Sequence, residues 1–381
     1  MTNAIKFLLA AVLFAGCASS SDCCSAKCGK KADCAKCEKQ SCAAACKKNA
    51  ECAKCTGSCG RQVCNCFAGR WAFVDSNWWM GIKKDAAGAF TATVLFGGGS
   101  PLVMETAKLE NGKLVIGGCR ARENAVAYGK EFKAPAPEKM RLDRLEVTVK
   151  DGVATVVASQ TDGNGKPCGQ ARTFTARRIP AIPAAPCLKS LKYGASIDLL
   201  ASGMADWEAM GDVTKRHFGW TMKDGILSNR IARKSDGTPK HGDLNIKTKR
   251  ADFEDFKISY DVRVPAGCNS GVYLRGIYEL QVIDSYGKSV NPHNMAALYG
   301  RVTPRVAAEK PAGEWQHVDA ILCDRHVTVV LNGVNIIDNA PIEGVTGGAL
   351  TSDEFKPGPI YLQGDHSDAD YRNMILTPIV K

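Results

Sequence analysis

Short apolar runs that end in glycine-containing turns are the feature that most limits how this chain can fold. Asn-Gly or Asp-Gly pairs occur at 111–112, 151–152, 224–225 and 332–333. Such pairs between apolar runs favour two-residue β-hairpin turns, because both positions then require a positive φ. Long amphipathic stretches with helical spacing are scarce. The chain is therefore predicted to be all-β.

The apolar runs fall into two groups on either side of a proline-rich segment. From 69 to 178 they return every eight to twelve residues or so, which predicts a small antiparallel β-barrel or meander. Residues 179–188 include three prolines and are typical of a stiff linker. The strand pattern then continues from 189 to 381, and its length suits a two-sheet jelly roll.

The amino-terminal residues are typical of an export signal. Lys6 precedes the apolar run 7–14, which is too short to span a bilayer, and Ala15-Gly16-Cys17 follows. Small residues directly before a cysteine resemble a bacterial lipoprotein signal. We expect residues 1–16 to be removed and Cys17 to carry lipid, anchoring the protein in the cell envelope, on the periplasmic side or at the surface. Ordinary secretion is the alternative.

Cysteines crowd into the segment 17–68, which holds 13 of the chain's 18. The pair Cys34-Ala-Lys-Cys37 returns eighteen residues later as Cys52-Ala-Lys-Cys55. Small and polar residues fill the rest, so this segment lacks the apolar side chains of a core. We expect a tether held by disulfides, with soft-metal binding, redox chemistry or lack of structure as alternatives.

The net charge of +11 does not indicate a nucleic-acid partner. Lysine and arginine are scattered along the chain rather than interleaved with aromatic residues in one stripe. We therefore expect no nucleic acid among the partners, and a membrane contact only through the lipid on Cys17.

Two neighbouring runs, 269–275 and 278–284, carry polar residues at alternate positions. Arg275 ends the first run, and Glu279 and Gln281 lie two apart in the second. Alternate residues of a strand share one face, and a core has no use for a row of this kind. This face is predicted to meet water or a polar ligand.

The region of about 195–380 resembles the 3-keto-disaccharide hydrolase domain family, which has a concanavalin A-like jelly-roll sandwich. The resemblance rests on ordered fragments rather than on one motif. They include Asn269-Ser-Gly271, Leu274-Arg275, Tyr278-Glu-Leu-Gln-Val-Ile-Asp284, Glu314-Trp315, Leu331-Asn-Gly333, Gly358 to Gln363, Asp365-His366 and Tyr371-Arg-Asn373.

The resemblance implies cleavage of glycosides that already carry a ketone at C3. The ketone acidifies the hydrogen on C2, so a base removes it, the C1 substituent leaves, and water adds to give net hydrolysis. Such a site needs a base, a donor for the enolate oxygen and an acid for the leaving group.

The expected catalytic residues are Glu279 as base or acid, Arg275 as oxyanion donor and His366 as acid or base. The expected substrate-binding residues are Gln281, Tyr273, Asp284, Asp365, Trp315 and Asn269. Alternatives stay open for several of these. Arg275 and Glu279 could form a cross-strand ion pair, His366 could be a surface residue, and Trp315 could belong to the core. Asp284 lies out of phase with Glu279, and Asn269 could shape a turn.

The apolar positions also predict the register of the two runs. A three-residue loop from Gly276 to Tyr278 would set Arg275 opposite Glu279 and Tyr273 opposite Gln281. Four apolar residues would then all face the core: Val272, Leu274, Leu280 and Val282. Gly276 is expected to adopt a conformation that favours glycine.

The favoured function is thus an enzyme that cleaves 3-keto-glucosides or 3-keto-disaccharides, with an oligosaccharide or glycoside as substrate. A lectin-like envelope lipoprotein that binds carbohydrate without cleaving it is the alternative, because the same sandwich serves both roles. A structural lipoprotein is a third. A divalent metal in the catalytic domain and a soft metal on the cysteine segment are left open as cofactors.

Overall fold

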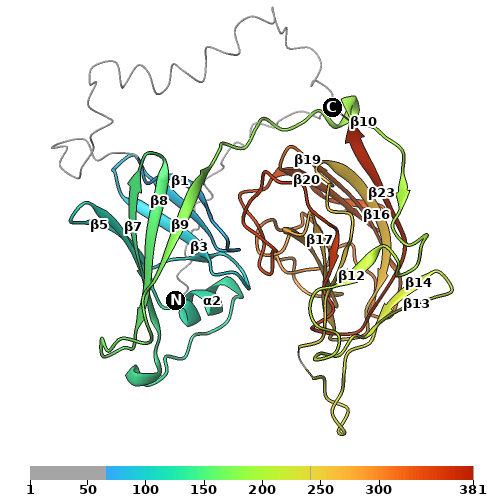
Figure 1. Ribbon diagram of the computed structural model, residues 1–381, viewed down its shortest axis with the longest axis horizontal. Helices are drawn as coiled ribbons and strands as arrows, with labels where there is room; N and C mark the ends of the chain where they lie inside the picture. Colours follow the sequence, from blue (N-terminus) through green and yellow to red (C-terminus); the bar gives the residue numbers. More distant parts are fainter. Residues whose placement is uncertain (1–65, 241, 381) are drawn as a thin grey trace, which may run out of the picture. The chain divides into compact units, whose positions relative to one another are not determined.

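The computed structural model describes residues 66–240 and 242–380. These residues belong to one compact unit, and nearly every regular element in it is a strand (Figure 1). The predicted signal, Cys17 and the cysteine segment up to residue 65 lie outside the described residues. Within the described part of the chain, no helix is long and apolar enough to cross a membrane.

The first part is a single antiparallel sheet that curls into a small barrel. Its order is β4-β3-β2-β1-β9-β8-β7-β6-β5, so β9 joins the first and last runs of a meander. Its strands are β1 (Gly69–Phe73), β2 (Trp79–Lys84), β3 (Phe90–Leu95), β4 (Leu102–Val103), β5 (Thr106–Glu110), β6 (Lys113–Gly118), β7 (Leu142–Lys150), β8 (Val153–Thr161) and β9 (Arg172–Ile179).

A short helix that the sequence did not predict follows β6. This helix, α2, spans Arg120–Ala127, and a 3-10 turn at Pro137–Lys139 follows it. Large apolar side chains fill the barrel, and Trp71 and Met80 are fully buried in it. The proline-containing residues 180–187 after β9 form neither strand nor helix.

The second part is a sandwich of two antiparallel sheets. The larger has the order β13-β14-β23-β16-β19-β20-β21, with β10 and β11 also paired to β23, and the smaller has the order β12-β15-β22-β17-β18. Their strands are β10 (Lys192–Tyr193), β11 (Ile197–Asp198), β12 (Trp207–Ala209), β13 (Trp220–Lys223), β14 (Ile226–Asn229), β15 (Ile246–Thr248), β16 (Phe256–Arg263), β17 (Asn269–Leu274), β18 (Tyr278–Ile283), β19 (Gln316–Cys323), β20 (His326–Leu331), β21 (Val334–Pro341), β22 (Tyr361–Leu362) and β23 (Ala369–Val380). A 3-10 turn at Leu188–Ser190 precedes β10.

Alternate residues of the two sheets meet in one apolar core. Ile258 and Val318 of the larger sheet are fully buried, as are Val272 and Leu280 of the smaller one, and all four belong to the same cluster. The strands therefore have one face committed to the core, which leaves the other face of the smaller sheet for polar side chains. This is the predicted all-β jelly-roll sandwich.

The Asn-Gly and Asp-Gly pairs at 111–112, 151–152, 224–225 and 332–333 form the predicted tight turns, with positive φ at both residues of each pair. At 332–333, for example, Asn332 has a φ of 50° and Gly333 a φ of 84°, and the pair joins β20 to β21. Positive φ at both central residues matches the right-handed twist of the flanking strands.

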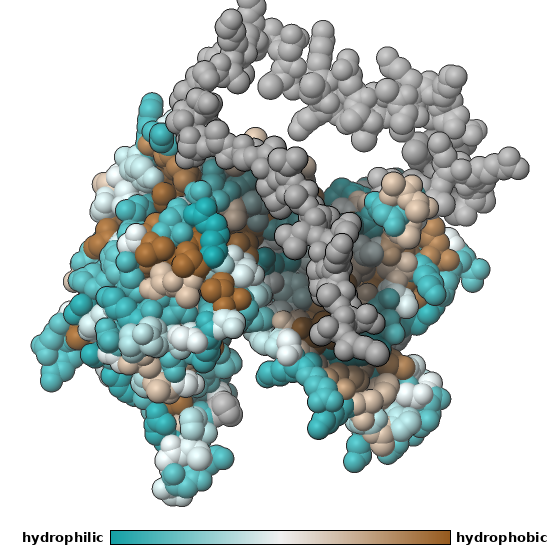
Figure 2. Space-filling model, turned by 180° about the vertical axis from the view of Figure 1, so that it is seen from behind, coloured by the Kyte–Doolittle hydropathy of each residue, from teal (hydrophilic) through white to brown (hydrophobic). Residues whose placement is uncertain are grey.

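On the face drawn in Figure 2, hydrophilic residues alternate with separate groups of apolar ones.

Candidate functional site

The loop between β17 and β18 decides which side chains face each other. The strands pair with Tyr273 opposite Glu279 and Gly271 opposite Gln281, and Arg275 to Ile277 form the loop. The loop has three residues, as predicted, but it begins one residue earlier. The expected φ at Gly276 is confirmed at 67°. The expected core positions are also confirmed: Val272, Leu274, Leu280 and Val282 are all buried in the apolar core.

The prediction that Arg275 faces Glu279 was wrong. Arg275 lies in the loop with a φ of 56°, and its side chain is buried. Its guanidinium donates hydrogen bonds to the backbone carbonyls of Glu354 and Lys356, the first at 2.8 Å. Arg275 therefore holds two loops together and does not take part in the polar row that contains Glu279.

That polar row crosses the smaller sheet on the face opposite to the core. Pairing places Glu208 beside Lys247, Lys247 beside Tyr361, Tyr361 beside Tyr273, and Tyr273 beside Glu279. Adjacent strands lie about 4.8 Å apart, so the row spans roughly 19 Å. Glu208 is exposed and forms an ion pair with Lys247 at 3.0 Å, whereas the last three residues are buried. The row thus leads from solvent to a buried carboxyl group.

Glu279 is that carboxyl group, and its side chain is only 3% exposed. The Tyr273 hydroxyl donates a hydrogen bond to Oε2 of Glu279 at 2.9 Å. Burial raises the pKa of Glu279 to about 8; the Tyr273 hydrogen bond opposes the increase, and the nearby Asp365 carboxylate adds to it. A carboxyl group with such a pKa exchanges its proton near neutral pH, as a general acid or base must.

Gly271 makes room for this carboxyl group. A Cβ atom at position 271 would lie 2.4 Å from Oε1 of Glu279, which is far inside van der Waals contact. The Glu279 side chain therefore occupies space that any other residue at position 271 would fill. Gly271 was part of the family resemblance, but no role was predicted for it.

Two further tyrosines, Tyr361 and Tyr299, lie near Glu279. The ring of Tyr361 stacks on Tyr273 with centroids 4.1 Å apart, and its hydroxyl accepts a hydrogen bond from Asn245 at 3.2 Å. The backbone N–H of Tyr299 donates to the Glu279 carbonyl at 3.0 Å. Sequence reasoning missed Tyr361, Asn245 and Tyr299, because none lies in the two runs that signalled the site. The available signals were two fragments of the family resemblance, Leu298-Tyr-Gly300 with Tyr299 and Gly358 to Gln363 with Tyr361.

Asp365 and His366 lie together in the loop between β22 and β23. His366 Nδ1 is 2.6 Å from an Asp365 carboxylate oxygen, and this hydrogen bond raises the pKa of His366. The Asn245 side chain accepts the Asp365 N–H at 3.1 Å and so fixes the start of this loop. Asp365 also acts electrostatically on both Glu279 and Tyr361, which places it near the buried end of the row.

Gln281 and Asn269 lie on the same strands as Glu279 and Tyr273. Gln281 is 2% exposed, and its side-chain oxygen accepts the N–H of Val282. The side-chain oxygens of Asn269 and Gln363 are buried and have no partner among the described residues. Unpaired buried acceptors favour a ligand that brings donors, and sugar hydroxyls are such donors.

Asp284 and Trp315 do not belong to the polar row. The Asp284 carboxylate accepts the Gly267 N–H at 3.0 Å, so it shapes the loop before β17. Trp315 precedes β19 in the larger sheet, where the guanidinium carbons of Arg263 and Arg372 lie 4.7 and 4.1 Å from its ring. Their predicted roles in binding substrate at this site are therefore not supported, because Asp284 contacts the loop before β17 and Trp315 packs against arginines of the larger sheet.

One group of side chains in the described part of the chain has donor atoms close enough to share a metal ion. It consists of Asp255, Cys323 and Asp324, whose donor atoms lie within 4.8 Å of one another. The group sits where β16 begins and β19 ends, in the larger sheet, and so it is not part of the polar row.

Comparison with known proteins connects the sandwich with carbohydrate chemistry. The family model described as a 3-keto-alpha-glucoside-1,2-lyase-like domain matches residues 197–377. A similar solved structure, provisionally described as a glycosyl hydrolase from Parabacteroides distasonis, has 21% identity and a TM-score of 0.36, over 48% of this chain and 98% of that one. A carbohydrate-binding module from Bacillus subtilis has 10% identity and a TM-score of 0.28, over 44% and 93%. Domain 4 of an extracellular arabinanase from Geobacillus stearothermophilus has 12% identity and a TM-score of 0.27, over 50% of this chain and 95% of that one. No curated protein matches the chain.

Proposed function

We propose that the protein cleaves glycosides whose C3 is already oxidised to a ketone, on the premise that residues 197–377 match the model of the 3-keto-alpha-glucoside-1,2-lyase-like family. The coarser conclusion, a carbohydrate-active domain of the glycosidase type, follows from the family match. The 3-keto step is the finer proposal, and the buried carboxyl group of Glu279 is the observation that supports it most.

The proposed reaction has two steps. In the first, a base takes the proton from C2, the electrons form the enolate of the C3 ketone, and the enolate then expels the C1 oxygen substituent, which takes up a proton. In the second, water adds across the resulting C1–C2 double bond, with hydroxyl at C1 and hydrogen at C2. The sum is hydrolysis of the glycosidic bond.

Glu279 suits the base of the first step. Its pKa of about 8 lies near neutral pH, and a base of that strength takes a proton far better than an ordinary carboxylate with a pKa near 4. The Tyr273 hydroxyl holds the carboxyl group in one orientation, and Gly271 leaves the space for it. An ordinary glycosidase instead needs two carboxyl groups at a fixed separation.

The donor and acid roles fall to residues other than Arg275. The guanidinium of Arg275 is already bound to two backbone carbonyls. His366, whose pKa is raised by the Asp365 carboxylate, carries a proton at neutral pH more readily than an isolated histidine and suits the acid for the leaving group. Gln281 offers an amide to the sugar hydroxyls.

Substrate must reach a carboxyl group that is closed off in this conformation. The segment 346–348 contacts the site directly. The Tyr273 hydroxyl lies 2.9 Å from the Gly347 carbonyl as well as from Glu279 Oε2, so its one proton is shared between these two acceptors, and the Glu279 N–H donates to the Thr346 hydroxyl at 2.9 Å. We therefore expect this segment to open when substrate binds and then to close again. Once it has closed, water is excluded from the site.

The direct test compares 4-nitrophenyl 3-keto-glucosides with the unoxidised 4-nitrophenyl glucosides, using both anomers of each. The expected result is nitrophenol release from one 3-keto anomer and negligible release from the unoxidised compounds. Deuterium at C2 should slow release, because that bond breaks in the first step. Comparable rates on the oxidised and unoxidised compounds would contradict the proposal.

Glu279→Gln and Glu208→Gln form a matched pair for this assay. Both remove one carboxylate from the same row, but Glu208 is exposed at the far end. Glu279→Gln should lower kcat by roughly 100-fold or more, and Glu208→Gln should leave kcat nearly unchanged. Binding of the glycosides without turnover, by both variants and by the wild type alike, would favour the lectin-like alternative instead.

A further inference from the structure

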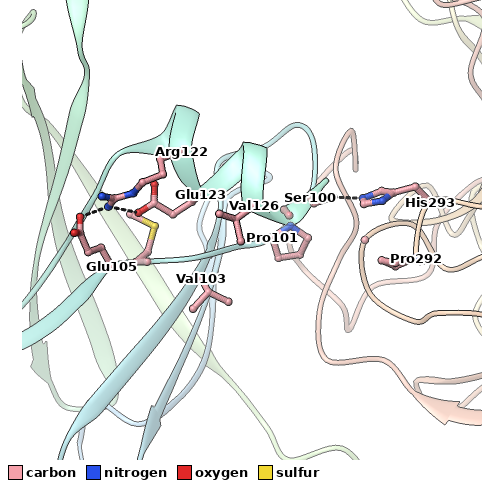
Figure 3. Close-up of a pocket in the computed structure, with 12 residues that line it drawn as sticks. Ser100, Pro101, Val103, Glu105, Arg122, Glu123, Val126, Pro292 and His293 are labelled. Atoms are coloured by element: carbon pink, nitrogen blue, oxygen red, sulfur yellow. Dashed lines mark hydrogen bonds and ion pairs between the residues drawn. The ribbon is translucent and has the colours of Figure 1, made fainter. Parts of the chain in front are cut away.

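A recess lies beside the barrel, and none of the chemistry above uses it. Its volume is about 500 Å³, which is within the usual range for pockets that bind small molecules. Figure 3 shows that most of its labelled side chains come from β4, from the loop before β4 and from helix α2. Apolar groups form most of the wall: Pro101, Val103, Met104, Val126, Ala127 and Pro292.

The apolar wall is accessible at its rim. Val103 is 67% exposed and Val126 is 71% exposed, although both are large apolar residues. Scattered single residues of this kind are ordinary on a protein surface, but these two flank one concave recess. The recess can therefore take the apolar part of a ligand directly from solvent.

The charged side chains of the recess do not balance one another. Glu123 lines it and is 7% exposed; its Oε1 pairs with Arg122 at 3.2 Å, and Oε2 has no partner among the described residues. Arg122 also pairs with Glu105, as the dashed lines in Figure 3 show. Two carboxylates thus share one guanidinium, which leaves one negative charge. A buried acceptor without a donor is costly, so a ligand that donates there gains affinity.

The histidine of the recess does not offset this charge. His293 Nε2 is 2.6 Å from the Ser100 hydroxyl, and burial lowers the pKa of His293, so the ring is neutral at pH 7. An anionic ligand would therefore meet excess negative charge, and a purely apolar ligand would leave Glu123 unpaired.

We propose that this recess binds a small amphipathic amine, with its apolar body against Pro101, Val103 and Val126 and its ammonium group donating to Glu123 Oε2. The apolar wall and the buried, unpaired carboxylate oxygen together carry this inference. It is independent of the carbohydrate site, so either can fail without the other.

Three probes of equal size and different charge test the charge preference on the full chain. They are 1-naphthylmethylamine, 1-naphthalenemethanol and 1-naphthoate, with affinity measured by calorimetry at pH 7. The amine should bind at least roughly tenfold more tightly than the alcohol, since a charge-assisted hydrogen bond replaces a neutral one, and the carboxylate should bind most weakly. Equal binding of amine and carboxylate, or no binding of the amine at millimolar concentration, would overturn the proposal.

Two variants and one control locate the site. Glu123→Gln keeps the shape and removes the charge, so amine affinity should fall about tenfold while alcohol affinity changes little. Val103→Trp adds a bulky ring at an exposed rim position, where folding is not at risk, and should weaken all three probes. Glu110 is an exposed carboxylate on β5 that pairs with Arg144, and Glu110→Gln should leave the affinities of all three probes unchanged. Amine binding that is unaffected by Val103→Trp would place the ligand elsewhere and refute the assignment.

Discussion

Replacing Glu279 with glutamine should change how the stability of the protein depends on pH. The variant keeps the size of the side chain and an oxygen that can accept the Tyr273 hydrogen bond, but it cannot ionise. In the wild type, burial raises the pKa of Glu279 from an ordinary 4.5 to about 8. A native pKa above the unfolded value means that the folded protein holds its proton more tightly than the unfolded chain does between these two pH values.

The magnitude follows from the two pKa values. Glu279 contributes its full stabilising share below about pH 4.5, and that share is lost as the pH rises to about 8. The difference of about 3.5 pH units corresponds to roughly 5 kcal/mol, at 1.36 kcal/mol per unit. As the pH rises from about 4.5 to about 8, the free energy of unfolding of the wild type should thus fall by up to roughly 5 kcal/mol relative to that of Glu279→Gln. The fall amounts to about 1.4 kcal/mol per pH unit.

Urea denaturation of both proteins at pH 5, 6, 7, 8 and 9, followed by circular dichroism, measures this difference. Every other ionisable group is shared, so the difference between the two curves isolates Glu279. Glu208→Gln, which removes an exposed carboxylate from the same row, serves as the control and should run parallel to the wild type. A difference in unfolding free energy between the wild type and Glu279→Gln that changes by less than roughly 0.3 kcal/mol per pH unit between pH 5 and 8 would show that Glu279 ionises normally, and it would refute the reasoning.

Four further predictions can be checked separately. Tyr273→Phe removes the hydrogen bond that lowers the pKa of Glu279, so the rising limb of kcat/KM against pH should move to higher pH by about one unit or more; an unmoved limb would exclude Glu279 as the group that titrates. Gly271→Ala displaces the Glu279 carboxyl group, and kcat should fall at least about tenfold while the far-ultraviolet spectrum stays unchanged. Arg275→Ala should lower the melting temperature, because two carbonyl partners are lost, yet leave kcat of the folded fraction within about twofold; a large loss of kcat would return Arg275 to the chemistry. We also propose that the mature protein is lipid-anchored at Cys17, so partitioning into the detergent phase of Triton X-114 should be lost in Cys17→Ser, and partitioning that survives the change would contradict the anchor.

The sequence by itself determined the strand content, the tight turns and the faces of the site strands. Alternation of polar and apolar residues has a period of two, so it assigned Val272 and Leu280 to the core and Glu279 and Gln281 to the other side. The Asn332-Gly333 pair predicted its hairpin because its conformation is set by the two turn residues themselves. These features depend on neighbouring residues only.

The tertiary structure alone decided the register and the chemical character of the site. Moving the β17–β18 loop by one residue in each strand leaves every side chain on its own face, so alternation cannot distinguish an Arg275–Glu279 pair from a Tyr273–Glu279 pair. Carbonyls of Glu354 and Lys356, about eighty positions later in the chain, hold Arg275 in the loop. The pKa of Glu279 likewise depends on burial by distant segments, and burial is a property of the packed chain that no local pattern encodes.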